Sequence, residues 1–144
     1  MIITGPFQKG QILIPAEIKI DALNLDGSAN FLVDTGSTVS FINESTALKM
    51  GIDYSKILYR DTLAGIGGEA EVYEIEGFTR LKFESGQDTK TIPRKNFLAV
   101  KHSFCEHVRE DARKRILALG GIIGMDMIKG FKFTTSGQNF TLDV

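Results

Sequence analysis

The chain has 144 residues, of which 42% are hydrophobic and 24% are charged, as is typical of one soluble globular domain. A formal net charge of −1 gives no support for a nucleic-acid or membrane-surface partner, and no apolar stretch approaches the length of a membrane span. Cys105 is the only cysteine, which excludes an internal disulfide and fits a reducing compartment. The first residues lack the charged and apolar segments of a signal peptide. We therefore expect a single cytoplasmic domain over residues 1–144.

Alternation of apolar and polar side chains predicts a mostly β fold. Residues 11–21 show the pattern with one buried face, and Asp26-Gly27 favours a hairpin turn after them. Ser85-Gly86 and Ser136-Gly137 favour two further turns. In chain order the expected strands are 11–21, 31–33, 39–42, a hairpin over 58–76, and then 78–84, 90–100, 122–124, 131–134 and 139–142.

Three segments predict helical structure. Asn43 is expected to cap a helix over residues 44–50, which Gly51 ends in the left-handed conformation. Residues 101–120 place an apolar side chain at every fourth position among charged ones, the pattern of an amphipathic helix. Residues 125–129 predict a helical turn or short helix.

The most informative segment is Asp34-Thr35-Gly36-Ser37, which lies between two apolar, strand-like runs. A carboxylate on such a tight loop lies at the rim of the core. One alternative is an ordinary turn or cap, because Asp and Gly are favoured turn residues. The other is catalysis, because two such carboxylates facing each other across a two-fold axis share a proton and activate water.

Two further glycine-containing segments accompany this loop. Gly65-Ile66-Gly67-Gly68 forms the tip of the hairpin over residues 58–76, and its isoleucine needs a contact, which argues against a functionless mobile loop. This tip lacks the lysine and the strand-to-helix context of a phosphate-binding loop. Ile122-Ile123-Gly124 leads from an apolar strand through glycine to a helix, as the Asp34 segment does. The two strands are expected to cross in the core and support the Asp34 loop from below.

With these three segments in this order, the chain resembles the retroviral-like (retropepsin-like) aspartic proteases over most of its length. The resemblance implies an all-β, closed-barrel-like fold with one or two short helices. It also implies a homodimer, because the chain has a single Asp-Thr-Gly. The implied activity is that of an aspartic endopeptidase acting on a peptide or an unfolded protein, without a cofactor. The alternative is a catalytically weak dimeric module that binds peptides or proteins on the same fold.

The resemblance also implies roles for individual residues near the carboxylate. Asp34 shares a proton with its symmetry mate and polarises a water, while Thr35 reaches across the axis and holds the two loops rigid. Gly36 permits the turn, and its carbonyl accepts a hydrogen bond from a bound peptide. Ser37 is expected to hydrogen-bond the outer carboxylate oxygen.

Substrate contacts are implied for the hairpin tip and for two side chains of the barrel. Gly65, Ile66, Gly67 and Gly68 form the flap that closes over substrate. Phe41 and Ile122 fall where the family lines its side-chain pockets, although either is equally well explained as core.

The chain departs from the retroviral pattern in two respects. Thr38 and Met125 replace an acidic residue and an arginine that pair in the retroviral enzymes, so the ion-pair network between subunits must differ. Lys101 to Leu117 is longer than the corresponding segment of the compact viral enzymes and is expected near the cleft. Asp126 has no Thr-Gly after it and is expected to act as a cap or a surface charge.

No metal site is expected. His102, Cys105 and His107 are close in sequence, but they do not share one face of a helix well, and no second cluster supplies further ligands. The charged stretch over residues 109–115 mixes both signs and predicts a solvated face rather than a nucleic-acid surface.

Overall fold

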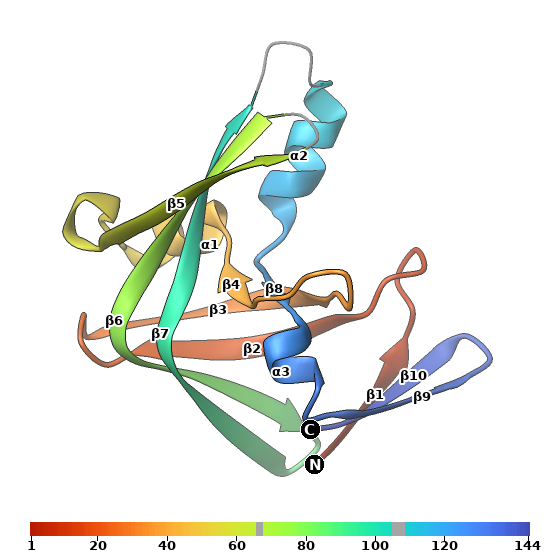
Figure 1. The fold of residues 1–144 in the computed structure, drawn as a ribbon. Helices are drawn as coiled ribbons and strands as arrows, with labels where there is room; N and C mark the ends of the chain where they lie inside the picture. The colour runs from red at the N-terminus through yellow and green to blue at the C-terminus, as the bar shows by residue number, and fades with distance from the viewer. Residues whose placement is uncertain (66–67, 105–108) are drawn as a thin grey trace.

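The structure is a computed structural model that describes residues 1–65, 68–104 and 109–144. The described part is mostly β, as expected, with a few short helices (Figure 1). The strands are β1 (Ile2–Pro6), β2 (Leu13–Ile20), β3 (Leu25–Val33), β4 (Phe41–Ile42), β5 (Leu58–Gly65), β6 (Gly68–Ser85), β7 (Asp88–Phe104), β8 (Gly121–Ile123), β9 (Lys132–Ser136) and β10 (Asn139–Asp143). The helices are α1 (Glu44–Met50), the 3-10 helix η1 (Tyr54–Lys56), α2 (Glu110–Ala118) and α3 (Met125–Ile128). None of these helices is long and apolar enough to cross a membrane.

One sheet closes on itself. Its strands follow the order β2-β3-β8-β4-β7-β6-β5, and a further pairing between β2 and β6 closes a six-strand mixed barrel with β5 outside it. The prediction of a closed barrel is therefore confirmed. Three α-helices lie in the described part, one in each segment predicted to be helical and more than the one or two that the family resemblance implied.

Alternation places one face of each barrel strand in the core. In β2, Ile14, Ile18 and Ile20 are at most 1% exposed, whereas Glu17 and Lys19 between them face solvent. Burial of each such aliphatic side chain contributes about 1.5–3 kcal/mol. The prediction of a strand with a single buried face at this position is confirmed.

The first hairpin turns earlier than predicted. Its turn covers residues 21–24, where Asn24 has a φ of 52°, whereas Asp26-Gly27 lies within β3. A Cβ atom on Gly27 would lie 2.3 Å from Cγ of Met50 in α1. The Asp26-Gly27 turn prediction was wrong because close packing of α1 on β3, rather than a turn, requires the glycine.

Both predicted ends of α1 are confirmed. The Asn43 side chain accepts a hydrogen bond from the Glu44 amide at 3.1 Å, and Gly51 ends the helix with a φ of 87°. Asn43 also donates through Nδ2 to the carbonyl oxygen of Ile116 at 2.8 Å. One side chain therefore starts α1 and ties it to α2.

Two long antiparallel strands, β6 and β7, form one side of the barrel and continue beyond it. They pair from Gly68 opposite Phe104 to Ser85 opposite Asp88. Gly77, with a φ of 80°, lies at a register shift in β6, so the two strands predicted over residues 69–84 are one bulged strand.

The predicted helix over residues 101–120 was wrong in its first part. Residues 101–104 belong to β7, where they pair with residues 68–71, and α2 begins only at Glu110. In residues 101–104, cross-strand pairing with β6 therefore determines the structure, because the helical pattern is weak there.

A second, three-stranded sheet has the order β1-β10-β9 and brings the two termini together (Figure 1). The Val144 amide donates to the Met1 carbonyl at 2.9 Å. The predicted hairpin around Ser136-Gly137 is confirmed, and Gly137 has a φ of 60°. The sequence did not predict β1, whose pattern of exposure alternates only between intermediate and exposed.

Candidate active site

Strand β8 lies between β3 and β4, the strands that precede and follow the Asp34 loop. It pairs in parallel with β3, with Val33 opposite Ile123, and antiparallel with β4, with Phe41 opposite Ile122. The Asp34 amide donates to the Ile123 carbonyl at 3.0 Å. The two apolar strands meet beneath the loop and support it, as expected, but they lie side by side in parallel rather than crossing.

The Asp34 carboxylate is oriented by its own loop. The Gly36 amide donates to Oδ1 of Asp34 at 2.8 Å. A Cβ atom on Gly36 would lie 3.1 Å from the same oxygen, so glycine leaves this bond undisturbed. Asp34 is half-buried, whereas Thr35 and Gly36 are exposed at the tip of the loop. The loop therefore presents a fixed carboxylate and its tip at the surface.

Gly124 allows the chain after β8 to lie against the second half of the loop. A Cβ atom there would lie 2.4 Å from the Val39 carbonyl oxygen and 2.7 Å from that of Ser37. The Met125 amide donates to the Ser37 carbonyl at 2.8 Å. Backbone contact of this kind fixes the loop only if residue 124 carries no side chain.

Ser40, Asp126 and Arg94 form a polar bracket around the same loop. Ser40 is 2% exposed; its hydroxyl donates to Oδ1 of Asp126 at 2.6 Å and accepts from the Gly124 amide at 2.9 Å. Arg94 on β7 pairs with the other carboxylate oxygen at 3.2 Å. Sequence reasoning placed Asp126 as a cap or surface charge, which was wrong: it ties α3 to the loop and to β7.

Ser37 differs from its expected role in this structure. Its hydroxyl donates to the Val39 carbonyl at 2.7 Å instead of to the Asp34 carboxylate. Thr38 and Met125, where the retroviral pair is missing, are both exposed. The Arg94–Asp126 pair lies close to these positions and stays within one chain.

A cavity of ≈ 460 Å³ opens beside the Asp34 loop. Asp34, Thr35 and Leu32 form one wall, and Phe133 and Leu142 of the terminal sheet form another. The catalytic candidate thus faces a hollow that two distant parts of the chain share.

Phe41 and Ile122, the two candidate pocket residues, lie next to each other in register on β4 and β8. Both are half-buried, whereas Ile42 and Ile123, which follow them in sequence, are 0% exposed. Since successive residues of a strand point to opposite faces, Phe41 and Ile122 lie on the face away from the core. This position suits a contact with a bound peptide.

The glycine-rich hairpin is formed by β5 and β6. Gly65 and Gly68 are opposite each other in register, and Ile66 and Gly67 lie outside the described residues. Strand β7 flanks β6 on its other side up to Gly68, so the hairpin is part of a three-stranded ribbon (Figure 1). Residues 101–104, the start of the segment expected near the cleft, therefore pair directly with the glycine-rich hairpin.

Of the three residues weighed as metal ligands, Cys105 and His107 lie outside the described residues. His102 bonds through Nε2 to Oδ1 of Asn43 at 2.6 Å. Burial lowers the pKa of its imidazole, and the Glu44 carboxylate opposes this shift. Among the residues that the structure describes, no group of three or more His, Cys, Asp or Glu side chains is placed to hold a metal ion.

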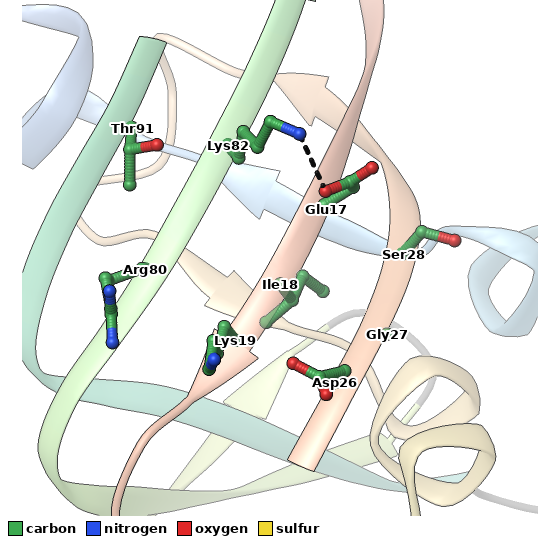
Figure 2. Close-up of a pocket in the computed structure, with 9 residues that line it drawn as sticks. All are labelled: Glu17, Ile18, Lys19, Asp26, Gly27, Ser28, Arg80, Lys82 and Thr91. Carbon is green, nitrogen blue, oxygen red and sulfur yellow. Dashed lines mark hydrogen bonds and ion pairs between the residues drawn. The ribbon is translucent and has the colours of Figure 1, made fainter. Parts of the chain in front are cut away.

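A larger cavity, of ≈ 560 Å³, lies away from Asp34 on the outer face of β2, β3 and β6. Figure 2 shows its charged lining, including the Glu17–Lys82 ion pair at 3.2 Å. Its side chains belong to regular antiparallel strands and alternate with buried ones. The arrangement is that of a solvated sheet face, so cavity size alone does not identify the site.

Comparison with known proteins agrees with this geometry. A sequence profile described as aspartyl protease matches residues 16–127, which include the Asp34 loop, the hairpin strands β5 and β6, and β8. The chain belongs to the retropepsin-like aspartyl protease family. This match covers well over half of the chain.

Two solved structures are similar to this retropepsin-like chain. A retropepsin-like aspartic protease from Rickettsia conorii is 17% identical with a TM-score of 0.54, over 99% of this chain and 90% of that one. The retroviral protease-like domain of Ddi1 from Leishmania major is 17% identical with a TM-score of 0.45, over 86% and 81%. No curated protein matches in sequence. At this identity the Rickettsia structure supports the fold alone.

Proposed function

We propose that the protein is an aspartic endopeptidase in which the Asp34 carboxylates of two copies together activate a water molecule. The observation that carries the proposal is the Asp34 loop. Its carboxylate is held by the Gly36 amide, its backbone is anchored to β8, and it faces a cavity. Membership of the aspartyl protease family supports the same chemistry.

The chemistry needs two carboxylates in different protonation states. The ionised one accepts a proton from water as the water oxygen attacks the scissile carbonyl carbon. The protonated one donates a hydrogen bond to the oxyanion that develops on the carbonyl oxygen. The sequence contains Asp-Thr-Gly only once, so the second carboxylate has to come from another copy of the chain.

The surface around the loop supports such a dimer. Thr35 and Gly36 are exposed at the tip, and every residue of β9, the edge strand of the terminal sheet, is exposed as well. Phe133 on β9 is 48% exposed and lines the same cavity as Asp34. A second copy that brings two Asp34 loops together across a two-fold axis would cover this face, with Thr35 as the contact across the axis.

The bound peptide is proposed to lie between the flap and the outward face of β4 and β8. Phe41 and Ile122 would contact its side chains, and Gly36 and Ser37 its backbone. Gly65, Ile66, Gly67 and Gly68 would close over it, and Ile66 would gain its contacts on closure. No cofactor takes part in this chemistry.

Cleavage of an unfolded protein tests the proposal. A statine-type inhibitor that mimics the transition state should suppress hydrolysis. Asp34→Asn should abolish it and leave the fold intact, while Asp26→Asn on the outer sheet face serves as a control. Hydrolysis that survives Asp34→Asn would refute the mechanism. Peptide binding without hydrolysis in the unmodified protein would favour the binding module.

A further inference from the structure

A charged hollow lies at the far end of the face that Phe41 and Ile122 occupy. We call it the outer pocket; its volume is ≈ 350 Å³, and it lies between the base of the flap hairpin, β7 and α3. The side chains that matter for its chemistry are Arg60, Glu74, Arg94, Lys95, Leu98 and Asp126. None of them belongs to the catalytic loop.

Strand register connects the outer pocket to Asp34. Residues opposite one another on neighbouring strands share a face of the sheet. Glu74 is opposite Leu98, Leu98 opposite Phe41, Phe41 opposite Ile122, and Ile122 opposite Leu32. Leu32 lines the cavity at Asp34. One continuous row of side chains therefore runs from the catalytic loop to the outer pocket.

The apolar part of this row faces outward. Its four apolar members, Leu32, Ile122, Phe41 and Leu98, are all half-buried. Neighbours that follow them in sequence, such as Ile123, Ile42 and Ala99, are 0% exposed. A peptide lying across the row would have its scissile bond at Asp34 and an outlying side chain at the outer pocket.

The charges of the pocket are layered. Arg60 is 57% exposed and covers Glu74, which is 10% exposed, and the two form an ion pair. Arg94 pairs with Asp126, which is 26% exposed, and Asp126 is also held by Ser40. Lys95 adds an exposed cation. Both carboxylates are thus already paired and less exposed than the cations, which form the accessible rim of the pocket.

This layering favours one sign of ligand. Three cations against two carboxylates leave a positive balance, and a hollow lined by one sign of accessible charge attracts the opposite sign. An incoming carboxylate would meet Arg60 and Lys95 without breaking an existing pair. An incoming ammonium or guanidinium group would have to displace Arg60 from Glu74, a buried carboxylate that is costly to leave unpaired.

We propose that the outer pocket makes the enzyme selective for peptides with an acidic side chain at a position away from the scissile bond. The inference rests on the proposed peptidase function and names its substrate class. It assigns to Arg60 and Lys95 a role in specificity rather than in catalysis. Replacement of either residue should change kcat/KM for acidic peptides and leave kcat/KM for neutral peptides nearly unchanged.

The experiment uses peptides that differ only by Glu, Gln or Lys at each position on either side of the scissile bond. At one outlying position the Glu peptide should be cleaved with a kcat/KM about two- to fivefold above that of the Gln peptide, the range of exposed ion pairs. The Lys peptide should be the poorest. The preference should largely vanish in 1 M salt, which screens exposed charges.

Lys95→Glu is the decisive variant because Lys95 is exposed, so its replacement leaves no buried group unpaired. It should abolish or reverse the Glu preference while the Gln peptide is cleaved as before. Lys90→Glu, with the same charge change on the same strand, should keep the preference. Arg60→Gln should reduce it; the rate on the Gln peptide reports any loss of folding.

Binding keeps this inference separate from the proposed function. The same peptides, fluorescently labelled, should bind Asp34→Asn with the same order of affinity, Glu before Gln before Lys. If the unmodified protein cleaves no peptide but this order of affinity holds, the peptidase proposal fails and the proposed binding preference of the outer pocket is supported. Equal affinities, a preference for Lys, or a Glu preference that survives Lys95→Glu would refute the proposed selectivity of the outer pocket.

Discussion

Replacement of Ser40 by alanine is the perturbation that best separates the support of the Asp34 loop from the chemistry itself. The Ser40 hydroxyl is buried and makes two hydrogen bonds, one to the Asp126 carboxylate and one from the Gly124 amide. Ser40 lies six positions after Asp34 and fixes that part of the loop. Loss of its hydroxyl should therefore loosen the loop without altering the Asp34 carboxylate.

The magnitude follows from those two bonds. The Gly124 amide loses its hydroxyl acceptor at a buried position, which costs about 1–3 kcal/mol. The hydrogen bond to a carboxylate adds about 1.5–3 kcal/mol, to be reduced because Asp126 keeps Arg94 and is partly solvated. We expect a loss of about 2–4 kcal/mol in the free energy of unfolding, or a Tm lower by about 10 °C.

Urea unfolding at one fixed protein concentration measures this loss, and peptide hydrolysis measures its effect on activity. At a temperature where the variant is fully folded, kcat should fall at least about tenfold, because small displacements of a catalytic group are costly. Ser45→Ala is the matched control. Its hydroxyl donates to Leu119 at 3.3 Å and should cost less than about 1 kcal/mol, with no change in kcat.

A Ser40→Ala variant as stable as the unmodified protein would refute the bracket of Ser40, Asp126 and Arg94. A variant destabilised as expected but with unchanged kcat would refute its role in positioning the loop. The two readouts therefore test separate parts of the reasoning.

Three other perturbations have defined outcomes. Gly124→Ala should lower the free energy of unfolding by about 1–3 kcal/mol and remove most of the activity, because the added Cβ would lie 2.4 Å from the Val39 carbonyl oxygen. Gly130→Ala, whose Cβ has its closest contact at 3.5 Å, should be neutral. Equal effects of the two variants in urea unfolding would contradict this reasoning. The lowered pKa of His102 means that the unfolded chain binds a proton more readily, so stability should fall as pH drops below about 6.5. His102→Gln should flatten that slope by up to about 1.4 kcal/mol per pH unit, and an unchanged slope would exclude His102 as its source. In hydrogen exchange, a statine-type inhibitor should protect the edge strand over residues 58–65, and no gain there would argue against closure of the flap.

Local signals in the sequence predicted the elements whose causes are local. Asn43 and Gly51 define α1 through a cap and a left-handed residue, and both act within a few positions of the helix. Alternation predicted the buried face of β2, and Ser136-Gly137 predicted the last hairpin. The Asp34 loop and its support from β8 also followed from a short motif between apolar strands.

The features that the sequence did not predict depend on contacts between distant segments. Gly27 looks like a turn residue until Met50, from α1, is seen to pack against it. Residues 101–104 join β6 because a partner strand thirty or more positions earlier is available to pair with them. The bracket around the loop joins Ser40 to Asp126, 86 positions apart, and no local pattern marks either residue.

The central claim is that Asp34 carboxylates of two chains act together, and mixed dimers test it most directly. Unmodified protein and Asp34→Asn are mixed in equal amounts at constant total concentration, allowed to exchange subunits, and assayed for peptide hydrolysis. If each active site needs two Asp34 residues, only about one quarter of the randomly formed dimers are active, so the mixture should retain about a quarter of the activity of the unmodified protein. Retention of about one half, as expected if each chain works alone, would contradict the account.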